Sequence, residues 1–285
     1  MANSHFGEIG DVWKHLVLGD VLDRVRPARY WETHAGSGTY ELDRSWEREY
    51  GVFTLLREAP RAPAIYASRF LGLVRTLPPR DDGAPRYPGS PRLAMEVLGD
   101  AAAYLLCDLD PVSVSDLTRT ARELDFQDLV RVERADGLAT VWAMAQALGP
   151  DPAAKTFVLL DPFDETERSI DDLDSLDLLT RLVAGGFPTV VWHGYDDVVR
   201  RDAIRARAVV HGVTTHTLDI ETSFLRGETT LHPGVGGCGM LIANVAEDVV
   251  DHVERLGRQL EACYDEALMP DGSPGTLRFT RTDLG

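Results

Sequence analysis

The stretch that follows Phe157 combines residue types suited to orienting an amine for reaction. An apolar run, Phe157 to Leu160, leads directly into Asp161, Pro162, Phe163 and Asp164. The run predicts a buried strand, and the proline stiffens the turn after it because its ring fixes φ. A carboxylate held at that tip can accept a hydrogen bond from an amine N–H and keep the nitrogen lone pair aimed at an electrophilic methyl group. We therefore predict catalytic roles for Asp161, Phe163 and Asp164.

Phe163 and Asp164 also carry predictions about the substrate. Phe163 can stack on a planar substrate, and the alternative is that it packs in the core. Two unit charges 4 Å apart interact by about 4 kcal/mol at an effective dielectric near 20. If Asp161 and Asp164 both face inward, the site favours an amine-bearing small molecule and repels a phosphate backbone. The alternative is that Asp164 points to solvent and begins an acidic loop over residues 164–174.

A glycine loop provides a second candidate site. Gly36 and Gly38 follow a strand-like stretch, Tyr30 to Glu32. Glycine lets a ligand approach the backbone closely, and open α/β sheets bind nucleotide-like ligands at the carboxyl ends of parallel strands. The spacing is neither the dinucleotide-binding Gly-x-Gly-x-x-Gly nor a P-loop, and an ordinary turn remains the alternative.

Two carboxylates follow the next predicted strands. Asp108 closes strand 103–108, where it can accept hydrogen bonds from ribose hydroxyls. Asp136 follows strand 130–133 and can accept from an adenine amino group. The alternatives are an exposed strand-end carboxylate for Asp108 and a turn before a helix for Asp136.

The elements that must position these residues alternate along the chain. Further strands are predicted at 156–161, 188–193, 214–220 and 238–244. Helices are predicted at 11–26 (amphipathic), 91–98 (capped by Ser90), 112–123, 138–148, 171–184, 197–211 and 247–262. Such alternation predicts parallel pairing in a doubly wound α/β sheet.

One segment interrupts this alternation. Residues 41–91 contain two helical stretches, 44–58 and 62–76, and a loop rich in proline and glycine, 77–91. We interpret 41–91 as a mostly helical insertion in a single domain made of 1–40 and 92–285. The tail 270–285 shows no clear pattern.

Charge and cysteine content restrict the partners. The net charge of −17 argues against a general nucleic-acid binder. Residues 44–92 nevertheless hold nine arginines against five acidic residues, a locally basic segment that can meet RNA or only solvate helices. Three scattered cysteines and eight histidines without ligand spacing predict reduced thiols in a cytoplasm and no metal. No apolar run of about 18 residues and no signal peptide occur, so we expect no membrane partner.

Several motifs together identify a family. The matching segments, in the family's order, are Gly10-Asp11-Val12-Trp13-Lys14-His15, Glu32-Thr33-His34-Ala35-Gly36-Ser37-Gly38-Thr39-Tyr40-Glu41-Leu42, Tyr87-Pro88-Gly89-Ser90-Pro91, Arg131 to Gly137, Leu159-Leu160-Asp161-Pro162 and Gly237-Cys238-Gly239-Met240-Leu241-Ile242. The chain resembles the bacterial 23S rRNA adenine-N6-methyltransferases of the J type. These are class I S-adenosyl-L-methionine (SAM) enzymes with a Rossmann-like fold and a small helical insertion.

The resemblance implies a cofactor and a set of site residues. The cofactor is SAM, the product is S-adenosylhomocysteine, and no metal takes part. The implied SAM pocket is lined by His15, His34, Ser90, Asp108, Asp136 and Gly137, with Gly36 and Gly38 in the adjoining loop and Asp161 both near SAM and catalytic. Lys14 lies beside this pocket, and we group it with Phe163 and Asp164 as substrate-binding.

Two features depart from the family. The family motif is Asp-Pro-Pro-Tyr, whereas Phe163 and Asp164 occupy its last two positions here. The family also has a longer, basic and aromatic N-terminal segment. The main prediction is therefore a SAM-dependent methyltransferase acting on a nitrogen of a small-molecule or nucleoside-like acceptor. The first alternative is the family's own reaction on 23S rRNA, supported by the basic insertion. The second is a protein that uses SAM for an intramolecular alkylation or only binds it.

Overall fold

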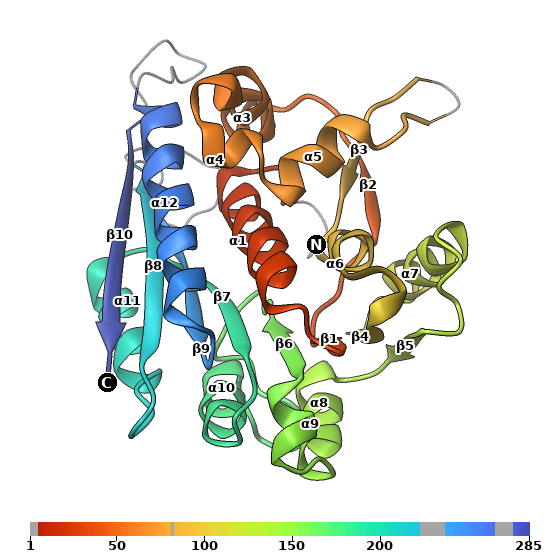
Figure 1. Ribbon diagram of the computed structural model, residues 1–285, viewed down its shortest axis with the longest axis vertical. Coiled ribbons are helices and arrows are strands. Elements are labelled where there is room, and N and C mark those ends of the chain that lie inside the picture. The colour runs from red at the N-terminus through yellow and green to blue at the C-terminus, as the bar shows by residue number, and fades with distance from the viewer. Residues whose placement is uncertain (1–4, 81–82, 223–236, 266–275) are drawn as a thin grey trace.

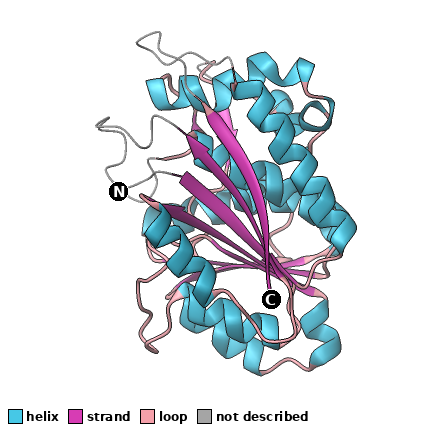
Figure 2. Cartoon of the chain, turned by 90° about the vertical axis from the view of Figure 1, so that its left-hand side faces the viewer, coloured by secondary structure: helices cyan, strands magenta, loops and turns pink. Residues whose placement is uncertain are grey.

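The computed structural model describes residues 5–80, 83–222, 237–265 and 276–285 (Figure 1). Its centre is an eight-stranded sheet of order β10-β8-β9-β7-β6-β1-β4-β5. The strands are β1 (Arg29–Glu32), β4 (Ala103–Asp108), β5 (Val130–Arg134), β6 (Thr156–Leu160), β7 (Thr189–Tyr195), β8 (Thr215–Thr222), β9 (Gly237–Ala243) and β10 (Leu277–Leu284). Helices cover both faces of this sheet (Figure 2). The predicted doubly wound α/β fold is therefore confirmed.

The predicted bounds of the insertion, residues 41–91, divide the helices into two groups, and the helix that begins at Ser90 crosses the second bound. The main fold holds α1 (Ile9–Val25), α6 (Ser90–Leu98), α7 (Pro111–Glu123), α8 (Gly137–Gln146), α9 (Pro150–Ala154), α10 (Ser175–Ala184), α11 (Val198–Arg207) and α12 (Glu247–Tyr264). The insertion holds α2 (Trp46–Arg48), α3 (Thr54–Glu58), α4 (Pro63–Tyr66) and α5 (Arg69–Thr76). It also includes β3 (Arg86–Pro88), which pairs with β2 (Thr39–Glu41) in a small antiparallel sheet. The proposed division into a main domain and an insertion stays a prediction.

The predicted parallel pairing is wrong at one side of the sheet. β9 runs antiparallel to both β7 and β8, and β10 runs antiparallel to β8. Parallel neighbours need a crossover, usually a helix, and no predicted helix separates the strands β8 and β9. The strand β10 was missed, although Leu277 and Phe279 alternate inward along it.

Helix α1 is buried far more completely than an amphipathic surface helix. Every residue from Val12 to Leu22 is buried, including Lys14 and His15. α6, α12 and α5 all pack against it, so the insertion covers the side that would otherwise face solvent (Figure 1). Polar side chains on α1 are therefore held inside the protein, where they must find partners.

The two faces of the sheet build separate cores. Tyr30 on β1 belongs to a core shared with α1 and α12, and its neighbour Trp31 belongs to a core shared with α10 and α11. This alternation follows from the two-residue period of a strand. Within the described part of the chain, no helix is long and apolar enough to cross a membrane.

Candidate active site

The predicted site residues converge at one edge of the sheet. β1 pairs in parallel with both β4 and β6, and β4 pairs in parallel with β5. The carboxyl ends of these four strands therefore lie side by side. They bring the predicted site residues Asp108, Asp136 and Asp161 to the same edge, together with Glu32, which was not predicted as a site residue.

Asp161 forms an ion pair with a buried lysine on α1. Lys14 Nζ lies 2.6 Å from Asp161 Oδ2 and 3.1 Å from Asp11 Oδ1. Burial opposes the charge on Lys14, but Asp161 and Asp11 outweigh it and raise the pKa of the ammonium group above its ordinary value. Lys14 therefore stays charged and fixes one oxygen of Asp161. Asp161 Oδ1 has no hydrogen-bond partner in the part of the chain that the structure describes.

Behind Lys14, a buried polar network holds α1 in place. Tyr87 Oη donates to Asp11 Oδ2 over 2.6 Å, and His15 Nδ1 lies 3.0 Å from Tyr87 Oη. Burial opposes ionisation of Asp11, but His15 and Lys14 lower the pKa of its carboxyl well below the ordinary value. Among the described residues, His15 Nε2 is buried without a hydrogen-bond partner. Neither Asp11 nor Tyr87 was predicted as a site residue, and the SAM contact predicted for His15 stays a prediction.

The glycine loop is held by carboxylates from neighbouring elements. Gly36 has φ = 59° and donates its N–H to Asp108 Oδ2 over 2.7 Å. Gly38 donates its N–H to Asp116 Oδ2 on α7 over 2.8 Å. Asp108 therefore lies directly against the loop, and its contact with ribose stays a prediction, whereas no sequence pattern had singled out Asp116.

Two further glycines let helix starts pack against this loop. A Cβ on Gly137 would lie 1.8 Å from the carbonyl oxygen of Thr33, and a Cβ on Gly89 would lie 2.0 Å from that of Ser37. Gly89 N–H also donates to the Gly38 carbonyl over 2.9 Å. The N-termini of α6 and α8 thus enclose the loop so closely that only glycine fits at these contacts.

The prediction that Ser90 caps α6 is wrong. It is already the first residue of the helix, and Gly89 occupies the N-cap position. Its Oγ instead donates to Glu32 Oε1 over 2.6 Å, while Tyr30 Oη donates to Glu32 Oε2 over 2.7 Å. Glu32 is fully buried, and burial raises the pKa of its carboxyl to about 8. Glu32 therefore ties the end of β1 to the start of α6 in its neutral form near pH 7.

Asp136 lies at the predicted edge of the sheet and also caps a helix. It is the N-cap of α8, where its Oδ1 accepts the N–H of Ala139 over 3.0 Å. Its Oδ2 accepts the N–H of Ile170 over 2.9 Å. The predicted turn before a helix is thus observed, and the contact with adenine stays a prediction.

His34 lies on the glycine loop, with Nδ1 2.8 Å from Thr33 Oγ1, and burial lowers the pKa of its imidazole.

Phe163 and Asp164 do not form the closed acidic pocket that the sequence suggested. Phe163 is 73% exposed, so the alternative of a core aromatic is wrong, and its ring centroid lies 6.3 Å from that of His5. Asp164 accepts from Thr166 Oγ1 over 2.7 Å and from Arg200 Nη2 over 3.2 Å. The hydrogen bond from Thr166 is the main reason that the pKa of Asp164 is lowered. Asp164 is therefore paired with a cation of α11 and adds no unpaired charge beside Asp161.

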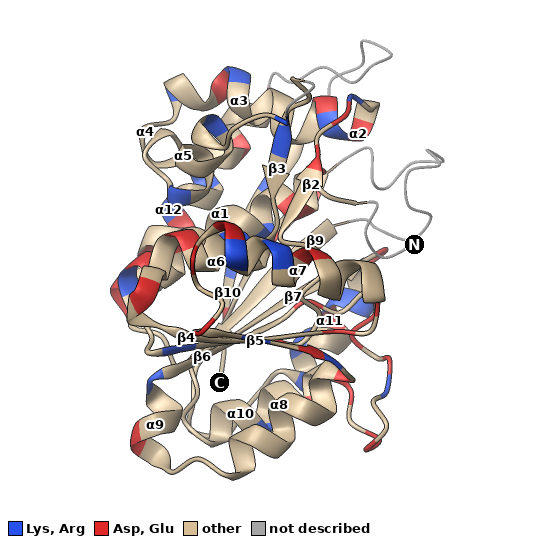
Figure 3. Cartoon of the chain, turned by 90° about the vertical axis from the view of Figure 1, so that its right-hand side faces the viewer, with Lys and Arg blue, Asp and Glu red and all other residues tan. Residues whose placement is uncertain are grey.

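The arginines of the basic segment, residues 44–92, are mostly paired as well. Acidic and basic residues lie next to each other on α2 and α3 (Figure 3). Arg75 lies 4.0 Å from the Tyr66 ring centroid. The others form ion pairs, which join Arg44 to Glu49, Arg48 to Asp43, Arg57 and Arg61 to Glu58, Arg69 to Asp23, Arg80 to Glu41, and Arg86 and Arg92 to Glu123. Arg48 and Arg92 are buried, whereas the side chains of five others are largely exposed: Arg44, Arg57, Arg61, Arg69 and Arg80. Exposed pairs contribute little free energy, so these five arginines can exchange partners.

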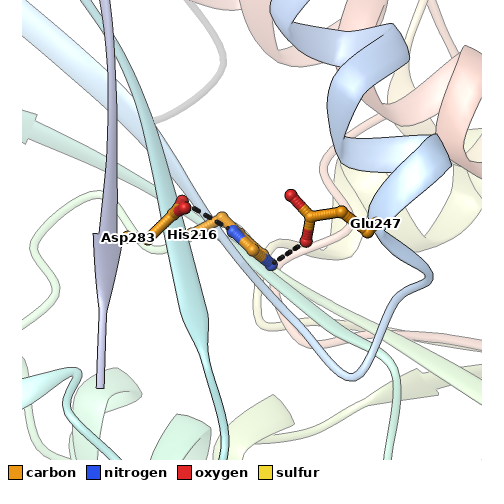
Figure 4. Close-up of side chains that lie close together, drawn as sticks. All are labelled: His216, Glu247 and Asp283. Atoms are coloured by element: carbon orange, nitrogen blue, oxygen red, sulfur yellow. Dashed lines mark hydrogen bonds and ion pairs between the residues drawn. The ribbon is translucent and has the colours of Figure 1, made fainter.

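A group with metal-ligating atoms lies away from this edge. His216 Nδ1 is 2.8 Å from Asp283 Oδ1 and its Nε2 is 3.5 Å from Glu247 Oε2 (Figure 4). The imidazole lies between the two carboxylates, so the three residues do not present their atoms to one point. Arg281 pairs with both carboxylates. This group is an ion-pair network that ties β10 to β8 and α12.

Comparisons with known proteins agree with the motifs. A family model described as "Ribosomal RNA large subunit methyltransferase D, RlmJ" matches residues 26–270. Two curated relatives are described as "Ribosomal RNA large subunit methyltransferase J". The one from Escherichia coli (strain K12) is 28% identical over 167 residues, which cover 55% of this chain and 56% of the relative. The one from Haemophilus influenzae is 26% identical over 192 residues, which cover 64% of this chain and 63% of the relative.

The chain thus spans less than two thirds of the length of these curated relatives. A crystal structure of a protein from Legionella pneumophila str. Philadelphia 1 covers 99% of both chains with a TM-score of 0.77 and 20% sequence identity, which supports the fold. Because the family model extends over most of the sequence, the chain belongs to the family described as ribosomal RNA large subunit methyltransferase D, RlmJ.

Proposed function

We propose that this protein is a SAM-dependent methyltransferase that transfers a methyl group to an adenine nitrogen of large-subunit ribosomal RNA. The observation that carries the proposal is the position of Asp161. It stands at the tip of β6, next to the glycine loop of β1, with one oxygen fixed by Lys14. This is a carboxylate placed to orient an amine beside a nucleotide-type site.

The residues present fit SAM as the methyl donor. The loop 33–38 packs against Gly89 and Gly137 so closely that a Cβ there would collide with its backbone, which holds the starts of α6 and α8 beside the loop. Asp108 and Asp136 stand at the next two strand ends, and each of their oxygens keeps a second lone pair beyond the contacts already made. These residues would hold the ribose and adenine. SAM supplies an activated methyl group, and the protein supplies position.

Asp108→Ala is expected to weaken SAM binding by about 10- to 100-fold, which corresponds to roughly 1–3 kcal/mol. The substitution leaves ribose hydroxyls unpaired and also releases Gly36 N–H from its acceptor. Calorimetric titration with SAM and S-adenosylhomocysteine measures the change. Asp151→Ala is the matched control, because Asp151 is exposed on α9 at the amino end of β6. Absence of binding of either compound to the intact protein would contradict the proposed cofactor.

The side chains suggest how the acceptor is oriented. Lys14 occupies Asp161 Oδ2, so Oδ1 is the oxygen that can accept an N–H of the acceptor amine. That bond keeps the nitrogen lone pair directed at the methyl group. Phe163, exposed at the adjacent turn, offers an aromatic face on which a base can stack.

The comparisons favour rRNA over the small-molecule acceptor of the main sequence prediction. That prediction depended on Asp164 as a second inward-facing anion, whereas Asp164 is paired with Arg200. The curated relatives are described as ribosomal RNA methyltransferases. Exposed arginines of the insertion, such as Arg57 and Arg61, can exchange weak carboxylate partners for phosphates.

A transfer assay tests the proposal. The protein is incubated with methyl-labelled SAM and either unmodified 23S rRNA fragments or a panel of amines and nucleosides. We expect label in an adenine of the RNA, and at least about 100-fold slower labelling with Asp161→Ala. Label only in small amines would favour the small-molecule acceptor. Methylthioadenosine as the product, with no labelled acceptor, would support the intramolecular alternative.

A further inference from the structure

The loop after Asp161 is held by a second cation, Arg200, which comes from the other face of the sheet. Lys14 belongs to α1, which packs in the core with α12, whereas α11 packs in the core with α10. Arg200 lies in the first turn of α11, where its own N–H donates to the N-cap side chain of Asp197 over 2.8 Å. The turn that carries Phe163 therefore runs between cations from opposite faces.

Arg200 binds two consecutive carboxylates of this loop. Its Nε and Nη2 lie 3.2 and 3.0 Å from Glu165 Oε1, and Nη2 also lies 3.2 Å from Asp164 Oδ1. Glu165 is only 3% exposed, and Arg200 is its only cationic partner among the described residues. A buried carboxylate is strongly destabilised when its partner is lost, so this contact defines where the loop lies.

Helix α11 is itself firmly attached, so it can act as a fixed support. Arg205 pairs with Asp219 of β8, which is fully buried. Arg207 Nη2 lies 2.7 Å from Oδ1 of Asp174, the N-cap of α10. A displacement of the α11 backbone that carries Arg200 would therefore require these contacts to move with it.

We propose that Arg200 is a positioning residue for the methyl-transfer reaction, and that its pair with Asp164 and Glu165 sets the direction of Phe163. Lys14 holds Asp161 and Arg200 holds Asp164, so only Pro162 and Phe163 lie between the two anchors. This pairing assigns a role to Asp164, which occupies the fourth position of the motif, where the family has an aromatic residue. In this chain the aromatic ring, Phe163, stands at the third position, and Asp164 anchors the turn. The inference rests on the proposed function for its kinetic test but not for its structural one.

The kinetic test compares Arg200→Gln with Arg201→Gln. Arg201 is adjacent on α11 and pairs with Glu221 of β8 instead of the loop, which makes it a matched control. Arg200→Gln is expected to lower kcat on RNA by about 10- to 100-fold, because small displacements of reacting groups carry costs of this size. SAM affinity should change less than about twofold, and Arg200→Lys should recover part of the loss by restoring the charge without the planar fork. Equal kcat for Arg200→Gln and Arg201→Gln would overturn the proposal.

The structural test uses amide hydrogen exchange over residues 164–170. Thr166 N–H donates to Asp164 Oδ1 in this segment, so its protection depends on Asp164 staying in place. Arg200→Gln should accelerate exchange here by about tenfold, while Arg201→Gln leaves it unchanged. This measurement needs no substrate, so it decides the role of Arg200 even if the protein fails to methylate RNA. Unchanged exchange in Arg200→Gln would overturn the inference.

Discussion

Asp161→Ala is expected to reduce turnover by at least about 10²- to 10³-fold while SAM affinity falls by less than about fivefold. Asp161 is the carboxylate whose remaining oxygen can hold the acceptor amine, and near-attack geometry accounts for a large part of the barrier. The predicted ribose and adenine contacts come from Asp108 and Asp136, at the ends of other strands. Asp161→Ala therefore leaves these contacts with SAM in place. Single-turnover methyl transfer at saturating SAM, together with calorimetry, measures both quantities.

The variant is also expected to fold. Removing Asp161 leaves Lys14 paired with Asp11 at 3.1 Å, so no buried cation loses its last partner. Asp202→Ala is a suitable control, because Asp202 is an exposed carboxylate that also pairs with a cation, Arg201. Equal rates for Asp161→Ala and the parent would remove Asp161 from the mechanism.

The order of elements was predictable from the sequence because it depends on local pattern. Apolar runs such as Phe157 to Leu160 give strands whose bounds agree with the structure within a few residues. Strand direction was harder, since it depends on which strands become neighbours. β9 enters between β7 and β8, and nothing local to residues 237–243 specifies that position.

The convergence of the strand-end residues was also predictable, because parallel pairing brings those ends together. Asp108 and Gly36, 72 positions apart, form a hydrogen bond of 2.7 Å as their strand positions implied. The residues that support this edge from behind could not be predicted. Asp11 and Tyr87 come from a helix and a small sheet whose approach depends on how the insertion packs on α1.

Asp164 illustrates the same limit for charge. Its sequence neighbours, Glu165 and Glu167, suggested an anionic pocket, yet Arg200 lies 36 positions away and pairs with it. The sign of a site depends on such distant pairs, which the local sequence does not contain.

Glu32→Gln is expected to stabilise the fold at neutral and alkaline pH. Burial raises the pKa of the folded Glu32 from an ordinary value of 4.5 to about 8. Both folded and unfolded forms are protonated below about pH 4.5, so the group costs nothing there. As the pH rises toward 8, the unfolded form ionises first and gains about 1.4 kcal/mol per pH unit, which amounts to roughly 3 kcal/mol at pH 7. Glutamine has nearly the same shape as glutamate but does not ionise, so the unfolded chain gains no such free energy.

Urea unfolding at pH 5 and pH 8 measures this effect, with the free energy of unfolding taken by linear extrapolation. Glutamine can accept one hydroxyl at Oε1 and donate from Nε2 to the other hydroxyl oxygen, so both contacts of Glu32 with Tyr30 and Ser90 persist, one of them reversed. The stability gain of Glu32→Gln should be small at pH 5 and several kcal/mol larger at pH 8. Glu133→Gln is the control, since Glu133 pairs with Arg131 at 2.6 Å on a partly exposed site. A gain of equal size at both pH values would mean that Glu32 titrates alike in the folded and unfolded protein, and its burial would then not control the stability of this edge.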